Sequence, residues 1–306
     1  MGEPRRIRLV CLGLSALDMT WSVDLLPHGG SKTRAFGMRE EGGGMAANAA
    51  VTAARLGASV SLWARAGDDP AGRRMRDELL AFGVDVSGFR LIPDARSSVS
   101  GIVVGRDGER MIVNFRGEGL DDDPAWLPLD QVGQAGAVLA DPRWPEGAAA
   151  LFSAAHAVRV PTVLDADRAD VAVFERLLPL ADYAVFSEQG LSDCVGPGRD
   201  VPAALGRARA MGCRLAGVTL GAHGVTWLDG DGLHQVPAFP VEVRDTTGAG
   251  DAFHGALAFA VAARWPVRRA MRFAAAVAAL KCKRPGGRDG LPDFASAQTL
   301  LQTSEE

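Results

Sequence analysis

Short apolar runs alternate with longer amphipathic or alanine-rich segments along the first part of the chain. Residues 7–14 and 60–66 are apolar runs that are typical of buried strands. Residues 45–56 are alanine-rich and residues 71–82 are amphipathic, and each segment stops at a glycine, as helices often do. This order of strand, helix, strand and helix predicts an α/β domain with a largely parallel sheet.

A different pattern interrupts this alternation. Residues 98–104 and 110–115 alternate like strands around a turn signal at residues 105–108, which predicts a hairpin. A two-stranded hairpin is barely stable alone, so we expect further strands beside it. Residues 21–23 and 34–38 are the candidates for these partners.

The chain is therefore predicted to be one domain of residues 1–306 with a small β-sheet lid inserted in it. The lid segments are expected at about residues 15–41 and 84–116. After the lid the alternation returns, and further core strands are expected at residues 137–140, 162–165, 183–186 and 215–219. An edge hairpin is expected from residues 225–228 and 233–236.

Composition and charge narrow the function classes. The net charge is −4 and basic residues form no block, which argues against a nucleic-acid partner. The apolar runs are shorter than the roughly 20 residues that a membrane span needs, so no membrane partner is expected. The four cysteines are scattered without a metal-binding spacing, which is typical of a reduced, cytoplasmic protein.

The most informative segment is Asp-Thr-Thr-Gly-Ala-Gly-Asp at residues 245–251, followed by a helix-compatible run at residues 252–263. Gly248 and Gly250 allow backbone N–H groups to approach an anion, and the helix start adds the positive end of its dipole. Phosphoryl transfer needs such donors to hold negative charge on the transferring oxygens. Asp251 could accept a hydroxyl proton as the attacking oxygen approaches the phosphorus.

A plainer interpretation is a glycine turn in which Asp251 only caps the helix. A lone Gly-x-Gly would favour that interpretation, because short motifs are weak evidence. Here the motif spans seven residues, carries two carboxylates and follows a strand-like segment at residues 241–243. These features together favour a functional site.

The same segment resembles the C-terminal signature of the ribokinase-like (PfkB) carbohydrate kinases. Residues 42–48, Gly-Gly-Gly-Met-Ala-Ala-Asn, resemble the N-terminal glycine signature of that family, and the resemblance extends from about residue 7 to residue 293. It implies a ribokinase-like three-layer α/β/α domain with a small β-sheet lid. The implied reaction is transfer of the γ-phosphate of ATP to a sugar hydroxyl.

The resemblance also implies a role for individual positions. Asp251 would be the catalytic base, and the N–H groups of Gly248, Ala249 and Gly250 would form the anion hole. Sugar-binding positions would include Asp18, Gly43 and Asn48. ATP-binding positions would be Ser187, Thr219, Gly221, Gly224, Thr246, Ala279 and Cys282.

Two metal ions enter through the resemblance. The family often shows Asn-x-x-Glu after the strand at residues 183–186, but here that place reads Ser187-Glu188-Gln189-Gly190. Mg²⁺ is therefore expected to be held mainly by ATP oxygens and water. Many relatives hold a monovalent cation such as K⁺, and the matching place here is near Asp245 and Thr247, with carbonyls from residues 284–289.

Several stretches are similar to ketohexokinase-like members of the family and above all to 6-deoxy-6-sulfofructose kinases. Lys32, Asn114 and Arg143 match the positions thought to grip the sulfonate, which as a permanent monoanion needs cationic and amide donors. This similarity implies conversion of 6-deoxy-6-sulfofructose to its 1-phosphate. Lys32 as a solvated lid residue and Arg143 as an ion-pair partner of Asp141 stay open as alternatives.

Rival functions also stay open. The nearest is a fructokinase, ketohexokinase or ribokinase acting on a neutral sugar, and a more distant one is a non-catalytic sugar or nucleotide sensor, which the intact Asp251 disfavours. A dinucleotide-dependent oxidoreductase fits poorly, because Gly13-Leu14-Ser15 lacks the later glycines of that fingerprint. The expected partners are a small-molecule sugar, ATP and a second copy of the chain bound through exposed lid edges.

Overall fold

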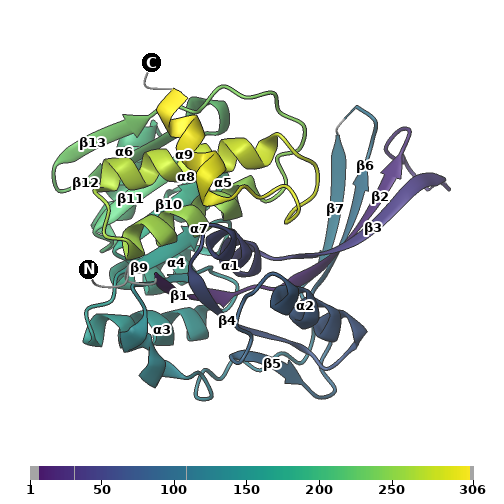
Figure 1. Ribbon diagram of the computed structural model, residues 1–306, viewed down its shortest axis with the longest axis horizontal. Helices are drawn as coiled ribbons and strands as arrows, with labels where there is room; N and C mark the ends of the chain where they lie inside the picture. The colour runs from purple at the N-terminus through teal and green to yellow at the C-terminus, as the bar shows by residue number, and fades with distance from the viewer. Residues whose placement is uncertain (1–6, 31, 108, 304–306) are drawn as a thin grey trace.

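A nine-stranded sheet forms the centre of the computed structural model, which describes residues 7–30, 32–107 and 109–303 (Figure 1). Its strand order is β13-β12-β11-β10-β9-β8-β1-β4-β5. The strands are β1 (Arg8–Gly13), β4 (Ser59–Gly67), β5 (Phe89–Ile92), β8 (Ala137–Ala140), β9 (Thr162–Ala166), β10 (Tyr183–Ser187), β11 (Leu215–Thr219), β12 (Val225–Asp229) and β13 (Gly232–Val236). Neighbours pair in parallel from β5 to β11, and β12 and β13 add an antiparallel edge.

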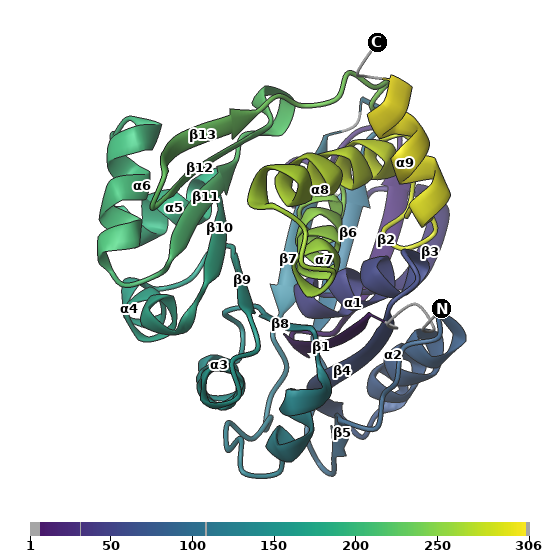
Figure 2. The same cartoon turned by 60° about the vertical axis from the view of Figure 1, so that its left-hand side comes forward.

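Helices cover both faces of this sheet (Figure 2). One face carries α1 (Met45–Arg55), α2 (Pro70–Ala81), α7 (Ala249–Ala262), α8 (Val267–Cys282) and α9 (Phe294–Thr303). The other carries α3 (Pro145–Ala157), α4 (Val171–Leu177), α5 (Glu188–Val195) and α6 (Val201–Ala210). Short 3₁₀ turns lie at Leu129–Gln134, Leu178–Leu180 and Gly221–His223. The expected three-layer α/β/α fold is confirmed.

The two faces have separate apolar cores, because side chains alternate along each strand. Along β1, Leu9 and Cys11 belong to one core, whereas Val10 and Leu12 belong to the other.

None of the helices in the described part of the chain is long and apolar enough to cross a membrane.

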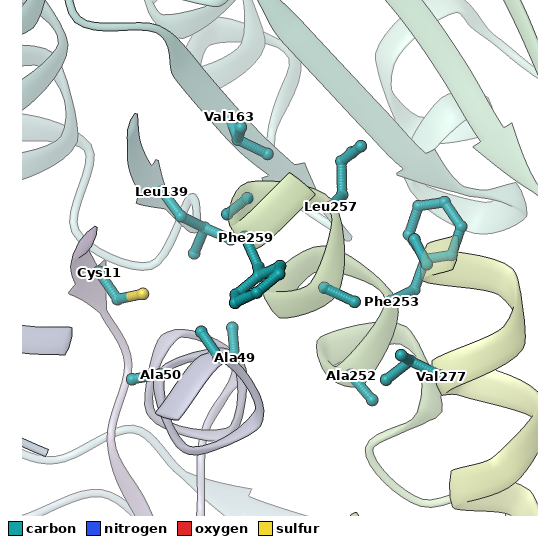
Figure 3. Packing of buried hydrophobic residues seen from close by; sticks show 14 of the residues in the cluster. Cys11, Ala49, Ala50, Leu139, Val163, Ala252, Phe253, Leu257, Phe259 and Val277 are labelled. Carbon is teal, nitrogen blue, oxygen red and sulfur yellow. The ribbon is translucent and has the colours of Figure 1, made fainter. Parts of the chain in front are cut away.

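Small residues bring α1 and α7 close together over the first core. Figure 3 shows Ala49 and Ala50 of α1 beside the apolar side chains of α7. A Cβ atom at Gly255 of α7 would overlap the carbonyl oxygen of Ala49, so only glycine permits this approach. The close packing sets the distance between the N-terminal turns of the two helices, where the polar site residues lie.

A separate four-stranded sheet projects from the body and has the order β3-β2-β6-β7 (Figure 1). Its strands are β2 (Ala16–Val23), β3 (Ala35–Gly43), β6 (Val99–Val104) and β7 (Arg110–Phe115). We call this sheet the lid. The expected turn between β6 and β7 includes Gly108, which lies outside the described residues.

The structure corrects several expected elements. Residues 241–243 form no strand; Val241 and Val243 instead line a cavity. Residues 89–92 fall within the range expected for the lid, but as β5 they pair with β4, because their apolar side chains complete the large sheet. Helix α7 begins at Ala249, three residues earlier than expected, which places Asp251 in its first turn.

The lid hairpin is longer than expected. Strand β2 begins at Ala16, earlier than the expected residue 21, so Asp18 lies within a lid strand. Strand β3 continues to Gly43, because Leu17 and Ala16 keep pairing with Gly42 and Gly43. The glycine segment is therefore the end of a strand that leads directly into α1.

Candidate active site

The backbone N–H groups at the N-terminus of α7 form a candidate anion site. Gly248 adopts a left-handed conformation with φ 72° and precedes the first helical residue. Among the residues that the structure describes, no protein acceptor pairs with the N–H of Gly248 or of Gly250. Ala249 N–H donates to Thr246 O at 3.2 Å, so this third expected donor is already engaged in the turn. The free donors and the helix dipole favour an anion here.

Asp251 lies beside these donors, in the first turn of α7. Its Oδ2 accepts a hydrogen bond from Asn48 Nδ2 of α1 at 2.7 Å. Burial, followed by repulsion from Asp165, raises the pKa of Asp251 to about 7, although the Asn48 hydrogen bond opposes the shift. A carboxyl group with a pKa near neutrality is suited to accept a proton from a substrate hydroxyl.

Asp165 and His254 form a buried group behind Asp251. Burial raises the pKa of Asp165, at the end of β9, well above its usual value. His254 Nδ1 lies 3.3 Å from Asp165 Oδ2 and 2.8 Å from Gly250 O, and His254 Nε2 lies 3.0 Å from Val185 O. Polar contacts of both ring nitrogens thus fix the position of the His254 ring beside Asp165.

The glycine segment that leads into α1 meets the lid aspartate. A Cβ atom at Gly43 would overlap the Asp18 carboxylate, so the close approach of this carboxylate requires glycine. Burial raises the pKa of Asp18, while the Ser100 hydroxyl and the Arg288 charge lower it. Asp18 therefore lies over the end of β3, just before the start of α1.

Arg288 connects Gly43, at the end of β3, to the side-chain amide of Asn48 in α1. Its guanidinium donates to Asn48 Oδ1 at 3.0 Å, to Gly43 O at 3.1 Å and to Glu78 Oε1 at 2.9 Å. Because Arg288 can only donate, it turns the oxygen of Asn48 toward itself and the NH₂ group toward Asp251. Glu78 also accepts the Gly42 N–H at 2.9 Å.

The lid contributes a polar row to the same region. Glu41, Asp18, Ser100 and Asn114 are paired directly across β3, β2, β6 and β7. Directly paired residues share one face of a sheet, so these four side chains lie together. Asn114 Nδ2 donates to Ser100 Oγ at 3.2 Å. Of the expected sugar-side residues, Asp18, Gly43, Asn48 and Asn114 are thus brought to one region.

A cavity of about 470 Å³ lies beside the N-terminus of α7, residues 248–250, which we call the helix mouth. Six of the expected ATP-binding residues line it: Thr219, Gly221, Gly224, Thr246, Ala279 and Cys282. Ala249 and Gly250 of the helix mouth line it as well, whereas Ser187 is not part of the lining. Apolar walls come from Phe239, Val241 and helix α8. One apolar pocket with a donor-rich end suits a flat base joined to a charged group.

Known proteins share this fold and sequence. A model of the pfkB family carbohydrate kinases matches residues 6–293. The chain belongs to the pfkB family of carbohydrate kinases. It is 30% identical over 299 residues to a ribokinase of Bacillus subtilis, covering 96% of this chain and 100% of that one. Fructokinase-2 of Oryza sativa is 28% identical over 307 residues, 91% of each chain.

Solved structures agree with this family membership. A crystal structure from Agrobacterium tumefaciens, whose description as a ribokinase is provisional, gives a TM-score of 0.93 at 34% identity and covers 98% of this chain and 99% of its own. Arabidopsis thaliana ribokinase, solved in complex with ribose and ATP, gives a TM-score of 0.84 at 26% identity, with 97% and 99% covered. The protein is thus an ATP-dependent sugar kinase of the ribokinase-like family.

Two further positions expected to grip a sulfonate, Lys32 and Arg143, lie outside the polar row of the lid. Lys32 is exposed in the connection between β2 and β3. Strand β2 ends at Val23, five residues beyond Asp18, which is about 17 Å along the strand at the usual rise. Arg143 follows β8; its backbone N–H donates to Asp141, but its guanidinium contacts Asp167 at 3.4 Å. The alternative of an Arg143–Asp141 ion pair is therefore wrong, because among the described residues the guanidinium pairs with Asp167.

The absence of the family's Asn-x-x-Glu motif is accounted for by the local contacts of Ser187 and Gly190. Ser187 caps α5 by accepting the Gly190 N–H, and its hydroxyl donates to Asp167 at 2.8 Å. A side chain at Gly190 would overlap Ala166 O, so a glutamate cannot stand there without a backbone shift. In the described part of the chain no three or more His, Cys, Asp or Glu side chains are grouped to hold a metal ion. That Mg²⁺ is held mainly by ATP oxygens and water stays a prediction.

The residues at the expected monovalent-cation site, near Asp245 and Thr247, do not fit a bound ion. The fully buried Lys281 of α8 donates from Nζ to Asp245 O at 3.2 Å, and Nζ lies 3.8 Å from Asp245 Oδ2. An ammonium group thus already lies at the oxygens of Asp245 that would hold the ion. Thr247 contributes its N–H, which donates to Asp245 Oδ1 at 2.8 Å.

Sequence reasoning missed several residues of this site. Arg110 of the lid donates to the hydroxyls of Thr247 and Thr246 at 3.1 and 3.2 Å, and so connects β7 to the loop before α7. Arg288 and Lys281 also escaped notice. A signal existed only for Lys281, since a lysine in an alanine-rich helix is unusual in a chain with three lysines. Arg110 and Arg288 gave no such signal, because arginine is common throughout this sequence.

Proposed function

We propose that Asp251 is the catalytic base of the sugar kinase and that Gly248 and Gly250 hold the phosphoryl group as it is transferred. The observation that carries this assignment is the position of an acid with a pKa of about 7 beside two unpaired N–H donors. In this step the bond from the γ-phosphorus to the bridging oxygen breaks and a bond to the sugar oxygen forms. The sugar hydroxyl proton moves to Asp251, and ADP leaves.

The nucleotide is proposed to occupy the cavity beside the helix mouth. Its base would lie between Phe239, Val241 and Ala279, which form the apolar part of the lining. Its phosphates would extend past Thr246 toward Gly250. Bound MgATP supplies the magnesium charge that screens the phosphate oxygens, and Arg110 is placed to add a positive charge from the lid.

The sugar is proposed to bind between the lid row and the start of α1. Asp18 would accept hydrogen bonds from sugar hydroxyls, and Asn48 would fix the position of Asp251. Closure of the lid would exclude water and limit hydrolysis of ATP. This arrangement accounts for why the carboxylate, the amide and the glycine segment are packed together.

For the sugar itself we propose 6-deoxy-6-sulfofructose, phosphorylated at its 1-hydroxyl. Its support is the pair Arg143 and Asn114, a cation and an amide donor near the sugar side, together with the similarity to sulfofructose kinases. Arg143 follows Asp141, whose carboxylate accepts the N–H groups of Leu14 and Ala46 at 2.7 and 3.0 Å. It is thereby tied to the start of α1. The competing candidate is a neutral sugar such as ribose or fructose, favoured by the names of the relatives.

An ATP-consumption panel distinguishes these sugars. We expect a higher kcat/KM for sulfofructose than for fructose, ribose or 2-keto-3-deoxygluconate. Arg143→Gln should lower kcat/KM for sulfofructose by about 10- to 100-fold, the value of a hydrogen bond to a charged group, and leave fructose nearly unchanged. Arg207→Gln on the exposed face of α6 is the matched control. Equal use of fructose and sulfofructose by the unchanged enzyme would contradict the sulfonate proposal.

We also propose that the lid binds a second copy of the chain. Met111 and Val113 alternate with Asn114 along β7, so they lie on the opposite face from the polar row, and they are 44% and 69% exposed. Met38 is paired into the same row as Met111 and is 52% exposed. An apolar sheet face bounded by the unpaired edges of β3 and β7 suits a second lid.

Light scattering after gel filtration tests the dimer. The expected mass is about twice the 32.1 kDa of one chain. Val113→Lys should yield a single-chain mass, since it places a charge in the apolar face, whereas Leu80→Lys on exposed α2 should not change the mass. A single-chain mass for the unchanged protein at micromolar concentration would contradict the proposal.

A further inference from the structure

Lys281 is a charged residue whose side chain the fold buries completely. It is fully buried near the C-terminus of α8, whereas Lys32 and Lys283 are exposed. Lysine is almost never fully buried unless it is paired, because removing an ammonium group from water is costly. Its burial therefore calls for a reason in the contacts of its ammonium group.

Within the described part of the chain, the hydrogen bond and the ion pair of Nζ are both with Asp245, the first residue of the motif at residues 245–251. Nζ donates to the backbone oxygen of Asp245 at 3.2 Å and lies 3.8 Å from its carboxylate. The carboxylate in turn accepts the Thr247 N–H at 2.8 Å and the Gly286 N–H at 2.9 Å. Asp245 thus connects Thr247 and Gly286 to the ammonium group of Lys281.

Neighbouring charges favour the ammonium form. Burial lowers the pKa of Lys281, but the carboxylates of Asp245, Glu41 and Asp251 oppose this shift. Burial likewise works against ionisation of Asp245, yet the Thr247 hydrogen bonds, Lys281 and Gly286 hold its pKa below the usual value. The hydrogen bond from Nζ to Asp245 O and the nearby Asp245 carboxylate fit an ammonium group, and the pair lies directly before Gly248.

We propose that the Lys281 ammonium is a tethered cation that takes the place of a bound monovalent ion behind the phosphate-binding loop, and so makes this kinase independent of K⁺. The proposal rests on the kinase activity and on the anion hole proposed above. A covalently tethered charge is present at any salt concentration, whereas a bound ion stabilises a loop only above its Kd. Lys281 would thereby fix residues 245–248, from which the phosphate donors project.

An ion and the lysine could not share this position. Two unit charges about 4 Å apart in a partly shielded site repel strongly enough to weaken ion binding by about 10³-fold. The oxygens of Asp245 can therefore serve either the ammonium group or an ion. Removing the ammonium group should free them.

Substitution of Lys281 by alanine tests this exchange. Lys281→Ala should leave a cavity beside Asp245 that K⁺ or NH₄⁺ can enter, and Lys281→Met should fill the same space without charge. Both variants should lose about 10-fold or more in kcat, because the donors at Gly248 are no longer held in position. KCl should restore much of the activity of Lys281→Ala, compared with choline chloride at equal ionic strength, but not that of Lys281→Met. Lys283→Ala, two residues on and exposed, is the control.

Thermal unfolding supplies a readout that needs no sugar. KCl in place of choline chloride should raise the Tm of Lys281→Ala by about 2 °C at a salt concentration tenfold above Kd. The Tm and kcat of the unchanged protein should be the same in the two salts. Because the Tm comparison uses neither substrate, it stays informative even if the proposed sugar or the role of Asp251 is wrong.

The unchanged protein decides the matter if Lys281→Ala fails to fold. Activation or stabilisation of the unchanged protein by K⁺ over choline would overturn the proposal. A folded Lys281→Ala that gains neither activity nor stability from K⁺ would overturn it as well. Independence of the unchanged protein, together with rescue of Lys281→Ala alone, is the expected result.

Discussion

Replacing Asp251 with asparagine is expected to lower kcat by about 10³-fold, within the range that general-base catalysis contributes. The amide cannot accept the sugar proton, but it has the shape of the carboxylate and can still accept the Asn48 hydrogen bond through its oxygen. The KM for ATP should change little, since the N–H donors are backbone groups. Steady-state kinetics with ATP binding measured separately will check this result.

The stability of the variant separates a lost base from a damaged fold. The pKa of Asp251 is about 7 in the folded chain and about 4 in an unfolded one, so folding stability falls as pH rises between these values. Above pH 7 the ionised carboxyl group destabilises the fold, and asparagine removes that effect. At pH 8 the Tm of Asp251→Asn should be equal to or higher than that of the unchanged protein. Asp77→Asn on the exposed face of α2 is the control.

The pH dependence of the unchanged enzyme follows from the same group. A base acts only when it is deprotonated, so kcat/KM should reach a plateau above pH 7 and fall about tenfold for each unit below it. A flat profile from pH 5 to 8, or unchanged turnover in Asp251→Asn, would contradict the assignment of the base.

Much of this site could be predicted because its chemistry lies in short, continuous segments. The motif at residues 245–251 places glycines and an acid within one turn of a helix, so local sequence was enough to identify the helix mouth. The strands of the large sheet were equally accessible, because buried parallel strands are continuous apolar runs. The lid strand β2 was harder to delimit, since it alternates Asp18 and Thr20 with large side chains.

What could not be predicted depends on contacts between distant segments. Arg288 reaches Asn48 across 240 positions in the chain, and Lys281 reaches Asp245 across 36. Burial raises the pKa of Asp165, followed by the charges of Asp167 and of Asp141, which lies in another part of the chain. The position of Lys32 could not be predicted for a similar reason, because the length of the β2–β3 hairpin sets the distance between Lys32 and Asp18.

Arg288→Met is expected to impair both stability and activity. Methionine fills the volume but leaves Gly43 O and Asn48 Oδ1 without their donor and Glu78 without its cation. Unfolding should become easier by about 3 kcal/mol, as for other broken buried ion pairs, which in a chain of this length lowers Tm by about 5 °C. Thermal unfolding measures this loss, with Arg268→Met on the exposed start of α8 as the control.

The activity of Arg288→Met should fall for a separate reason. Without Arg288, no other side chain in the described part of the chain donates to the Asn48 oxygen, so the amide can rotate and leave the base misplaced. A loss of about 10²-fold in kcat/KM is expected from such a displacement.

The double variant Glu78→Gln with Arg288→Met separates the two effects. Removing both charges takes away the unpaired carboxylate, and the introduced glutamine amide can still accept the Gly42 N–H, so much of the lost Tm should return. Activity should not return, because the amide of Asn48 still lacks its donor. Recovery of activity along with Tm would mean that Arg288 only stabilises the fold, and the orientation of Asn48 would then have to be set by another group.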